Sequence, residues 1–347
     1  MGRSKQSKWK RYVPYFLVTT TYLYEFFLSH QAIVLYAQNG APKFGKLKVM
    51  YHLVAFVMYN TNHFSILGQS NIICSLVQNI LRIEGELRNT SASARKRVSY
   101  SLQTIAVMVN YFLVALFQTV TIQIGIMTRP ESQMYLSSFY GKNPPLWIKI
   151  ATCIFTYGAH GTHVLGLVFN ILVVAIYVHV FNNTLLYLTI KNHSCIFHPG
   201  LGCHAREEAI RYYRRLSVLQ AHFNATFGKW VLGAEITLMW VVVFNIFLAI
   251  VFGTVRGTVN GVIGTIIFLQ FYKMMGQTYE LSKGTLGSWR KVTYRVDSPW
   301  MKRSMRACKP LAVNVGSFCY ADKSLMLTIL AIISSASANL ILTFRYD

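Results

Sequence analysis

The last apolar run of the chain, about residues 322–344, carries polar side chains that hydrocarbon cannot solvate. These side chains lie toward its C-terminal end: Ser334, Ser335, Ser337, Asn339 and Thr343. Because lipid offers no hydrogen bonds to hydroxyl and amide groups, they must face other helices or water. Two interpretations remain open, a close helix–helix interface and the lining of a water-filled pore.

Further polar and aromatic residues lie in the outer halves of the other apolar runs. Such residues are costly inside a membrane and are default candidates for a site. They include His30, Gln31, His52, Tyr59, Gln118, Gln123, Tyr157, His160, His163 and Asn245. Aromatic rings with a few hydrogen-bonding groups are typical of small-molecule sites. The candidate ligand-binding residues are Phe155, Tyr157, His160, His163, Gln118 and His52. Hydrogen bonding between helices is the alternative for each one.

Two patterns resemble metal ligands only superficially. The stretch HSCIFHPGLGCH combines His and Cys residues, but its spacing is not that of a zinc finger. In HGTH, His160 and His163 share one helix face, yet no carboxylate cluster completes a metalloenzyme site. We therefore expect no metal, no cofactor and no enzymatic activity.

Glu235 and Lys273 form a candidate ion pair within the apolar runs. They are 21 and 17 positions from Arg256, which lies in the short connection between two adjacent runs. A similar depth would let them pair, which would offset part of the cost of burying each charge.

Composition decides the class of protein that holds these residues. The 347 residues are 53% hydrophobic and only 13% charged, and mean hydropathy is +0.37. These values are too apolar for a soluble globular protein and indicate a polytopic membrane protein. The formal net charge of +23 would suggest nucleic acid in a soluble chain, so the positions of the basic residues decide its meaning.

The sequence predicts seven membrane-spanning helices of about 20 or more residues. They cover residues 12–37, 48–70, 101–127, 147–188, 230–253, 259–281 and 322–344. The fourth is too long for one crossing and has no internal turn signal, so we expect one tilted helix that continues into water.

The basic residues predict the orientation. About 24 of the 34 Lys and Arg residues fall in the N-terminus and the second, fourth and sixth connecting segments. The positive-inside rule then places the N-terminus in the cytoplasm and the C-terminus outside. The basic charge needs no nucleic-acid partner, and the first span is expected to be an uncleaved signal anchor.

The cytoplasmic segments carry helical periodicity of their own. Spans 2 and 5 are expected to extend as helices and to pack into a bundle, with 71–100, 189–229 and 282–321 as cytoplasmic extensions of a single domain over 1–347. The six cysteines lie in the membrane or the cytoplasm, so no disulfide is expected. Sequons at Asn89, Asn182, Asn192 and Asn224 also lie on the cytoplasmic side and are expected to stay unglycosylated.

The order of these segments resembles the insect gustatory receptor family. The resemblance is carried by VQNILRIEGELR after span 2, VFNNTLLYL closing span 4 and GSFCYADKSLMLTILAIISSASANLILTFRYD at the end. That family ends its last helix with Thr-Tyr, five hydrophobic residues and Gln-Phe. Phe344 matches the Phe, whereas Thr343, Ala336 and Ser337 stand where Gln, Thr and Tyr are usual.

The resemblance implies a ligand-gated, non-selective cation channel subunit of the insect chemoreceptor type. Four subunits, identical or mixed with other gustatory receptors, would surround a pore lined by the last helix, with Thr343, Phe344, Ser337 and Asn339 at the pore or gate. The ligand would be a small-molecule tastant bound in the outer half of the other helices. The protein would lie in the plasma membrane of a chemosensory neuron.

Three alternatives remain open. A G-protein-coupled receptor would need the N-terminus outside, and the sequence has no Asp-Arg-Tyr after span 3 and no Asn-Pro-x-x-Tyr in span 7. A small transporter would show Gly/Pro-interrupted helices in paired positions, yet only Pro14 lies within a span. The divergent terminal motif is also compatible with a non-conducting partner subunit.

Overall fold

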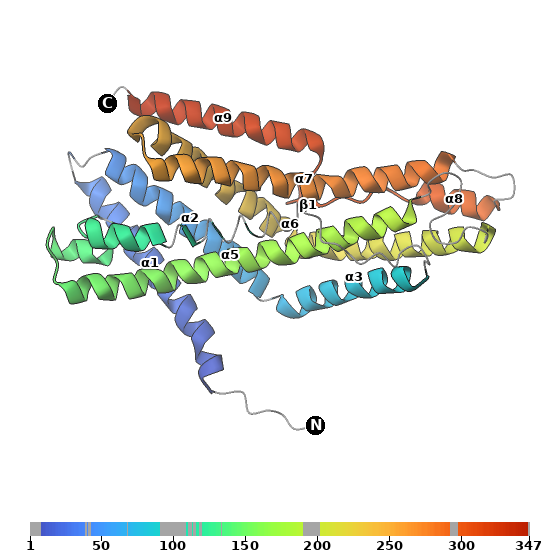
Figure 1. Cartoon of the computed structure of the whole chain (residues 1–347), viewed down its shortest axis with the longest axis horizontal. Helices are drawn as coiled ribbons and strands as arrows, with labels where there is room; N and C mark the ends of the chain where they lie inside the picture. The colour runs from blue at the N-terminus through green and yellow to red at the C-terminus, as the bar shows by residue number, and fades with distance from the viewer. Residues whose placement is uncertain are drawn as a thin grey trace. The chain divides into compact units, whose positions relative to one another are not determined.

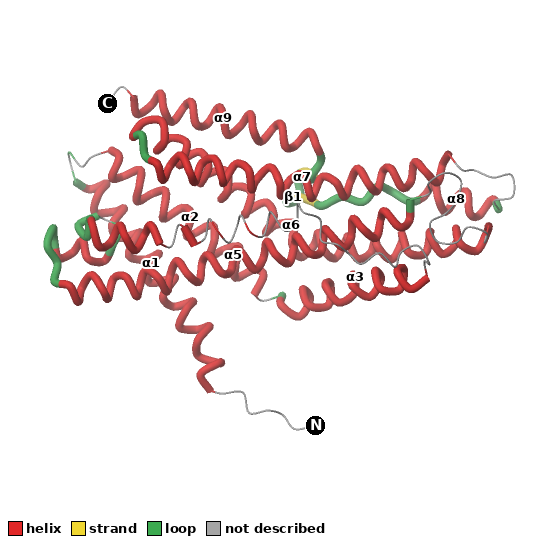
Figure 2. The backbone as a smooth tube through the Cα atoms, viewed as in Figure 1, coloured by secondary structure: helices red, strands yellow, loops and turns green. Residues whose placement is uncertain are grey.

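The computed structural model describes residues 8–38, 40, 43–67, 69–90, 109, 113, 116–117, 120–132, 134–189, 202–291 and 298–345. Nearly all of these residues are helical, and one pair of two-residue strands is present among them (Figure 2). The chain forms two compact units. Unit 1 comprises Met1–His63 and Tyr111–Asn170, and unit 2 comprises Phe64–Asn110 and Ile171–Asp347.

Unit 1 is built from α1 (Lys8–Ala37), α2 (Lys43–Leu67), the first part of α5 (Leu146–Leu188) and the short 3-10 helix η2 (Leu136–Tyr140). Buried Ala32 and Leu35 of α1 pack with Val49 of α2 near the connection of the two helices. Consecutive helices joined by a short connection run antiparallel, so later residues of α2 meet earlier residues of α1.

Unit 2 contains α3 (Ser70–Thr90), the rest of α5, α6 (Gly202–Phe252), α7 (Val255–Lys291), α8 (Pro299–Ala307), β1 (Asn314–Val315), β2 (Cys319–Tyr320) and α9 (Lys323–Arg345). The main contact joins α6 to α7, and α9 lies along both of them (Figure 1). The backbones approach closely at Gly257, where an added Cβ would lie 2.8 Å from the Asn245 carbonyl oxygen. Glycine is therefore required where α7 begins its return along α6.

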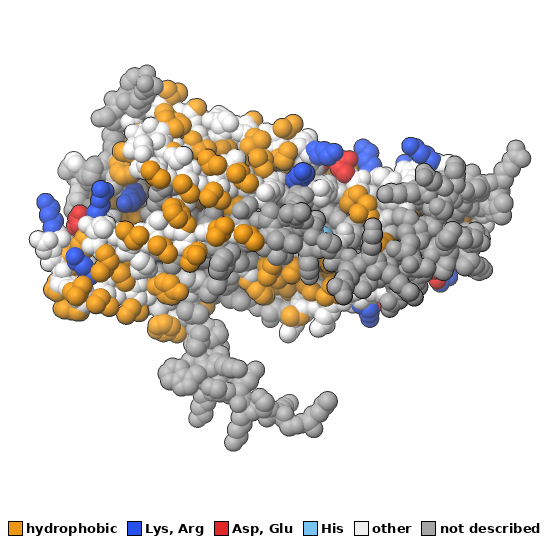
Figure 3. Space-filling model, viewed as in Figure 1, with side chains coloured by type: hydrophobic (Ala, Val, Ile, Leu, Met, Phe, Trp, Pro, Cys, Tyr) orange, Lys and Arg blue, Asp and Glu red, His pale blue; other side chains and the backbone are white. Residues whose placement is uncertain are grey.

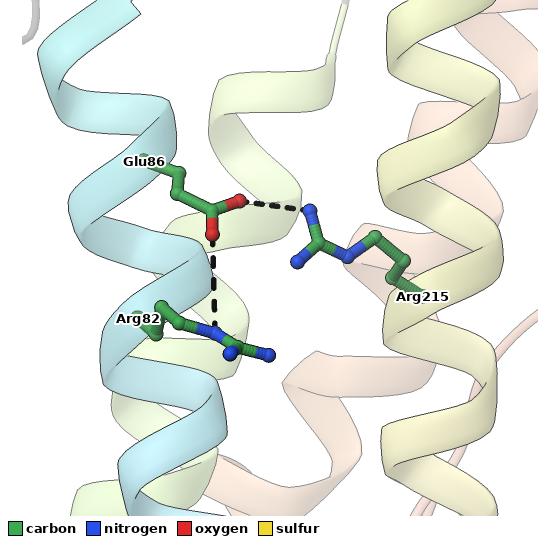
Figure 4. A network of polar contacts seen from close by, with 3 residues as sticks. All are labelled: Arg82, Glu86 and Arg215. Carbon is green, nitrogen blue, oxygen red and sulfur yellow. Dashed lines mark hydrogen bonds and ion pairs between the residues drawn. The ribbon is translucent and has the colours of Figure 1, made fainter.

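Helix α3 covers part of α6 with an apolar face. Its buried side chains follow helical spacing: Ile73, Leu76, Ile80, Ile83 and Leu87. At the edge of this contact, the Glu86 carboxylate joins Arg82 of α3, at 3.9 Å, to Arg215 of α6, at 2.8 Å (Figure 4). These side chains are partly exposed, so the pair with Arg215 contributes about 0.2–1 kcal/mol. Apolar burial therefore stabilises this contact more than charge does.

Helices α5 and α7 are joined by buried hydrogen bonds. The Asn182 side chain accepts a hydrogen bond from the Thr278 hydroxyl at 2.8 Å and donates one to the Met274 carbonyl oxygen at 3.3 Å. The Trp289 indole N–H donates to the Leu188 carbonyl oxygen at 2.9 Å. Asn182 is 7% exposed and makes both bonds, which agrees with the prediction that its sequon carries no glycan.

The predicted spans agree with the observed helices at several positions. The fourth span is one helix of 43 residues, α5, as predicted, and α6 is continuous from the predicted cytoplasmic extension into span 5. The predicted extension of span 2 is helical, as α3, but it is a separate helix, because α2 ends at Leu67 and α3 begins at Ser70. A glycine at position 68 lowers helix propensity between them.

Three helical stretches within the described residues are long and apolar enough to cross a membrane: Phe169–Leu188, Glu207–Phe252 and Lys323–Phe344. On the face shown in Figure 3, hydrophobic side chains cover the part of α9 in view, and Lys and Arg side chains gather along the second half of α7. The seven crossings and the sides of the two termini stay predictions.

Candidate functional site

Helix α9 has two different faces. Polar side chains at Thr328, Ser335, Asn339 and Thr343 are exposed and spaced seven, four and four residues apart. At about 100° per residue this spacing places them on one line along the helix, which we call the polar stripe. Ile332 interrupts the stripe. A second exposed line beside it is mainly apolar and includes Leu327, Ala331 and Ala338, with Ser334 as its polar member.

The polar groups of the stripe differ in how they are satisfied. The Thr343 hydroxyl donates to the Asn339 carbonyl oxygen at 2.8 Å, and the Thr328 hydroxyl donates to the Ser324 carbonyl oxygen at 3.2 Å. The Asn339 side-chain amide makes no hydrogen bond to any residue that the structure describes. An amide without a partner is costly in hydrocarbon, so this side chain requires water or another polar group.

The opposite face of α9 is buried against α6 and α7. It carries Ile329, Ile333 and Ser337, which is 5% exposed. The sequence grouped Ser337 with Asn339 and Thr343 at the pore, but the structure places it across the helix from them. Phe344 is half-buried, and its ring centroid lies 5.4 Å from that of Phe247 on α6. Of the four pore candidates, Asn339 and Thr343 therefore lie on the exposed face, and Phe344 packs at its edge.

The start of α9 is fixed by a cap and by a close contact. The Asp322 carboxylate accepts hydrogen bonds from the Leu325 backbone N–H at 2.7 Å and the Ser324 hydroxyl at 2.8 Å, which satisfies free groups of the first turn. At Gly276 of α7, an added Cβ would lie 3.3 Å from the Asp322 carbonyl carbon. The absence of a side chain at Gly276 therefore lets the first turn of α9 lie against α7.

The extended segment before α9, residues 308–322, is held by side chains of α6. Gln220 and Asn224 both donate to the Ala312 carbonyl oxygen, at 2.9 and 3.0 Å. Asn224 also accepts from the Asn314 backbone N–H at 3.0 Å. The short pairing of β1 with β2 follows directly. Movement of α6 would therefore be transmitted to the start of α9 through this segment.

A second set of hydrogen bonds ties the same segment to both long helices. The Tyr213 hydroxyl of α6 donates to the Lys309 carbonyl oxygen at 2.7 Å and lies 2.7 Å from the Ser282 hydroxyl of α7. Ser282 accepts from the Leu311 backbone N–H at 2.6 Å. Burial also raises the pKa of the Cys308 thiol, at the first residue of the segment. The start of this segment is thus tightly packed.

Unit 1 holds an aromatic cluster that contains two of the six ligand candidates. Its centre is Tyr24, whose ring lies 5.0 Å from Phe56, 6.1 Å from Phe155 and 5.3 Å from His160, centroid to centroid. The Tyr24 hydroxyl donates to the Met134 carbonyl oxygen at 3.0 Å, which fixes the ring. The structure therefore brings Phe155 and His160 together around a tyrosine that the sequence analysis did not select.

The other four ligand candidates have different positions. Tyr157 is 60% exposed and does not belong to the cluster. His52 is half-buried, and its Nδ1 lies 2.9 Å from the Lys48 carbonyl oxygen one turn earlier. Gln118 and the side chain of His163 lie outside the described residues. Tyr24 was missed in the sequence because its importance lies in burial and in a hydrogen bond to a residue 110 positions away. A sequence does not reveal such a contact.

The predicted pair of Glu235 and Lys273 is wrong. Glu235 is 7% exposed on α6 and lies near Tyr272, the residue before the lysine. Lys273 is exposed and forms no ion pair with any residue that the structure describes. One position along α7 turns a side chain by about 100°, so the depth argument located the right turn of the helix but the wrong face.

No group of three or more His, Cys, Asp or Glu side chains within the described ranges could hold a metal ion. The HSCIFHPGLGCH stretch lies outside the residues whose side chains are described. Cys74, Cys153, Cys308 and Cys319 are free thiols.

Comparison with known proteins gives a match in structure only. No protein-family model matches the chain, and no curated protein matches it in sequence. The chain is similar to the insect olfactory receptor OR5 from Machilis hrabei, with a TM-score of 0.64 at 10% identity, covering 100% of this chain and 92% of that one. It is also similar to that receptor in complex with eugenol, with a TM-score of 0.61 at 10% identity, covering 99% and 93%. The likeness shows that the chain has the fold of these receptors.

Proposed function

We propose that this chain is a chemoreceptor subunit of a ligand-gated, non-selective cation channel, of gustatory type, in the plasma membrane. The observation that carries the proposal is the polar stripe of α9, above all the exposed Asn339 amide. Only 17% of the most apolar 18-residue stretch of this helix is buried, whereas 67% of the corresponding stretch of Phe169–Leu188 is buried. Helix α9 therefore has a large surface that a second subunit, lipid or water must cover.

Water is the best partner for the stripe. Moving an amide without a hydrogen-bond partner from water into lipid costs about 2–7 kcal/mol, depending on the reference state. If four subunits place α9 around one axis, the polar stripes face an aqueous pore and the neighbouring apolar line faces protein or lipid. The same arrangement places Thr343 and Phe344 near the outer end of the pore, because α9 ends at Arg345.

The ligand and the partners follow from the fold by analogy. The solved relative was determined in complex with eugenol, a small molecule. We assign this chain a small-molecule tastant, bound by the aromatic cluster around Tyr24, and subunits that are copies of itself or other gustatory receptors. The seven crossings, the cytoplasmic N-terminus and the chemosensory neuron belong to the same proposal, supported by the distribution of Lys and Arg.

Thiol labelling tests whether the polar stripe faces water, and it needs no agonist. Cysteine at Asn339 or Thr343 should react from the extracellular side with a membrane-impermeant methanethiosulfonate reagent, because thiolates form in water. Ala338→Cys is the matched control, since Ala338 is exposed at the same depth but lies about 100° around the helix. Ser337→Cys controls for the buried face. We expect the cysteines at positions 339 and 343 to react at least tenfold faster than those at positions 338 and 337.

Equal labelling at Asn339→Cys and Ala338→Cys would overturn the pore assignment of α9. Labelling of the stripe in surface-expressed protein that never passes current would instead favour the non-conducting partner subunit. In a monomeric G-protein-coupled receptor or small transporter, the exposed stripe of α9 would face lipid, and all four cysteines would react slowly.

A further inference from the structure

One carboxylate stands among the helices of unit 1. Across Met1–His63 and Tyr111–Asn170, the acidic residues are Glu25 and Glu131. Glu131 lies in an exposed turn, whereas Glu25 lies in the middle of α1. Glu25 forms no ion pair with any described residue. A carboxylate among apolar helices without a cation is expensive, and such residues are usually retained for function.

The one side-chain partner of Glu25 among the described residues is neutral. The Asn60 side-chain amide of α2 donates to Glu25 Oε2 at 2.5 Å. Asn60 is 4% exposed and Glu25 is half-buried. This bond satisfies one oxygen of the carboxylate but supplies no positive charge, and Oε1 accepts no hydrogen bond from a described residue. The second oxygen of this half-buried carboxylate can therefore still accept a cationic donor.

Aromatic residues lie within about one helical turn of Glu25 and of its partner Asn60 along α1 and α2. Tyr24 precedes Glu25 in α1, and Phe56 precedes Asn60 by four residues, one turn of α2 or about 6 Å. The Tyr24 and Phe56 rings lie 5.0 Å apart, and the His160 ring lies 4.9 Å from Phe56. Faces of tyrosine and phenylalanine attract organic cations, and a carboxylate at one turn's distance adds a full opposite charge.

A buried hydroxyl without a partner lies on the third helix of the same unit. Thr156 of α5 is 0% exposed, and its Oγ1 has no hydrogen-bond partner among the described residues. It lies one turn before His160, on the helix that contributes Phe155 and Ala159 to the cluster. In a helix, threonine usually satisfies its hydroxyl with a carbonyl one turn earlier. An unsatisfied hydroxyl here is consistent with a polar group of a bound molecule.

We propose that the aromatic cluster of unit 1 binds a small organic cation, an ammonium group on an apolar or aromatic body, with Glu25 as its counter-ion. The proposal rests on the assignment of the chain as a small-molecule receptor and names the class of its ligand. The ammonium group lies between the Glu25 carboxylate and the Tyr24 and Phe56 rings, and the apolar body packs against Phe155. Asn60 is a positioning residue that holds the carboxylate.

A pair of probes of equal shape and different charge tests the proposal. Benzyltrimethylammonium and neopentylbenzene differ by the replacement of N⁺ by carbon. Binding of each is measured by isothermal calorimetry on the full chain in nanodiscs. The cation should bind the wild type at least tenfold more tightly than its isostere, where tenfold is about 1.4 kcal/mol. Glu25→Gln keeps the hydrogen bond from Asn60 and should abolish this preference, whereas Glu131→Gln should leave it unchanged.

Equal affinity for the two probes, binding of neither, or a cation preference that survives in Glu25→Gln would each overturn the proposal. If Glu25→Gln does not fold, Glu25→Asp replaces it, with a reduced preference expected, and the wild-type comparison still decides. The result is independent of conduction: cation binding without current would overturn the channel assignment alone. Currents evoked by neutral compounds, with no cation preference in binding, would overturn only the ligand class.

Discussion

Replacing Phe344 by alanine removes an aromatic ring that joins the end of α9 to α6. The ring of Phe344 meets the fully buried ring of Phe247 at 5.4 Å and an interplanar angle of 64°. Aromatic pairs of this edge-to-face type contribute about 0.5–1.5 kcal/mol beyond the burial of their area. Phe344 thus stands at the proposed outer mouth, held by a contact of modest energy.

The effect on basal current follows from this energy if the ring pair exists only in the closed channel. A difference of 1.4 kcal/mol is a factor of 10 in an equilibrium constant. Loss of the pair should therefore raise the ratio of open to closed channels about two- to twelvefold. Phe247→Ala removes the same pair from the other side and should raise the ratio similarly.

The assay is basal current per channel at the cell surface, compared among wild type, Phe344→Ala, Phe247→Ala and the double variant. If the two rings act through each other, the double variant should resemble the larger single effect. Unchanged current from surface-expressed Phe344→Ala would refute a gating role for this residue. Fully additive effects of the two substitutions would refute the ring pair as the cause.

Alkylation of Cys308 should be slower than that of exposed Cys74 at neutral pH, because burial raises the Cys308 pKa and lowers its thiolate fraction. Variants that retain one cysteine measure this, and the Cys308 rate should increase with pH; equal rates would contradict it. Replacing Asn224 by leucine removes hydrogen bonds to the extended segment before α9 and should cost about 2–4 kcal/mol, visible as a lower midpoint of heat inactivation. Arg215→Ala should change that midpoint little, since its bond to Glu86 is partly exposed; an equal loss in both variants would contradict the ranking.

Periodicity and length predicted the long elements of the fold. A run of apolar residues without a turn signal predicted α5 as one helix, and the continuous pattern around Tyr213 predicted the long α6. These predictions succeed because helical hydrogen bonds are local and the apolar pattern records which elements are long. The last apolar run, predicted as a span over residues 322–344, is the helix α9 from Lys323 to Arg345.

Which face of each helix is buried, and against which neighbour, could not be predicted from the sequence. Ser337 and Asn339 are two positions apart and lie on opposite faces of α9, because each residue turns the helix by about 100°. The same geometry places Tyr272, rather than Lys273, near Glu235. The bond between Glu25 and Asn60 joins residues 35 positions apart, and no local pattern reports which helices meet.

The native mass of the purified protein in nanodiscs is the most direct test of the proposed tetrameric channel, because this measurement needs no ligand and no current. We expect a particle with four 39.6 kDa chains, in which the exposed face of each α9 meets the others around one axis. A stable monomer of 39.6 kDa would contradict the tetrameric channel, because the exposed polar stripe of each α9 would then have no other subunit to face.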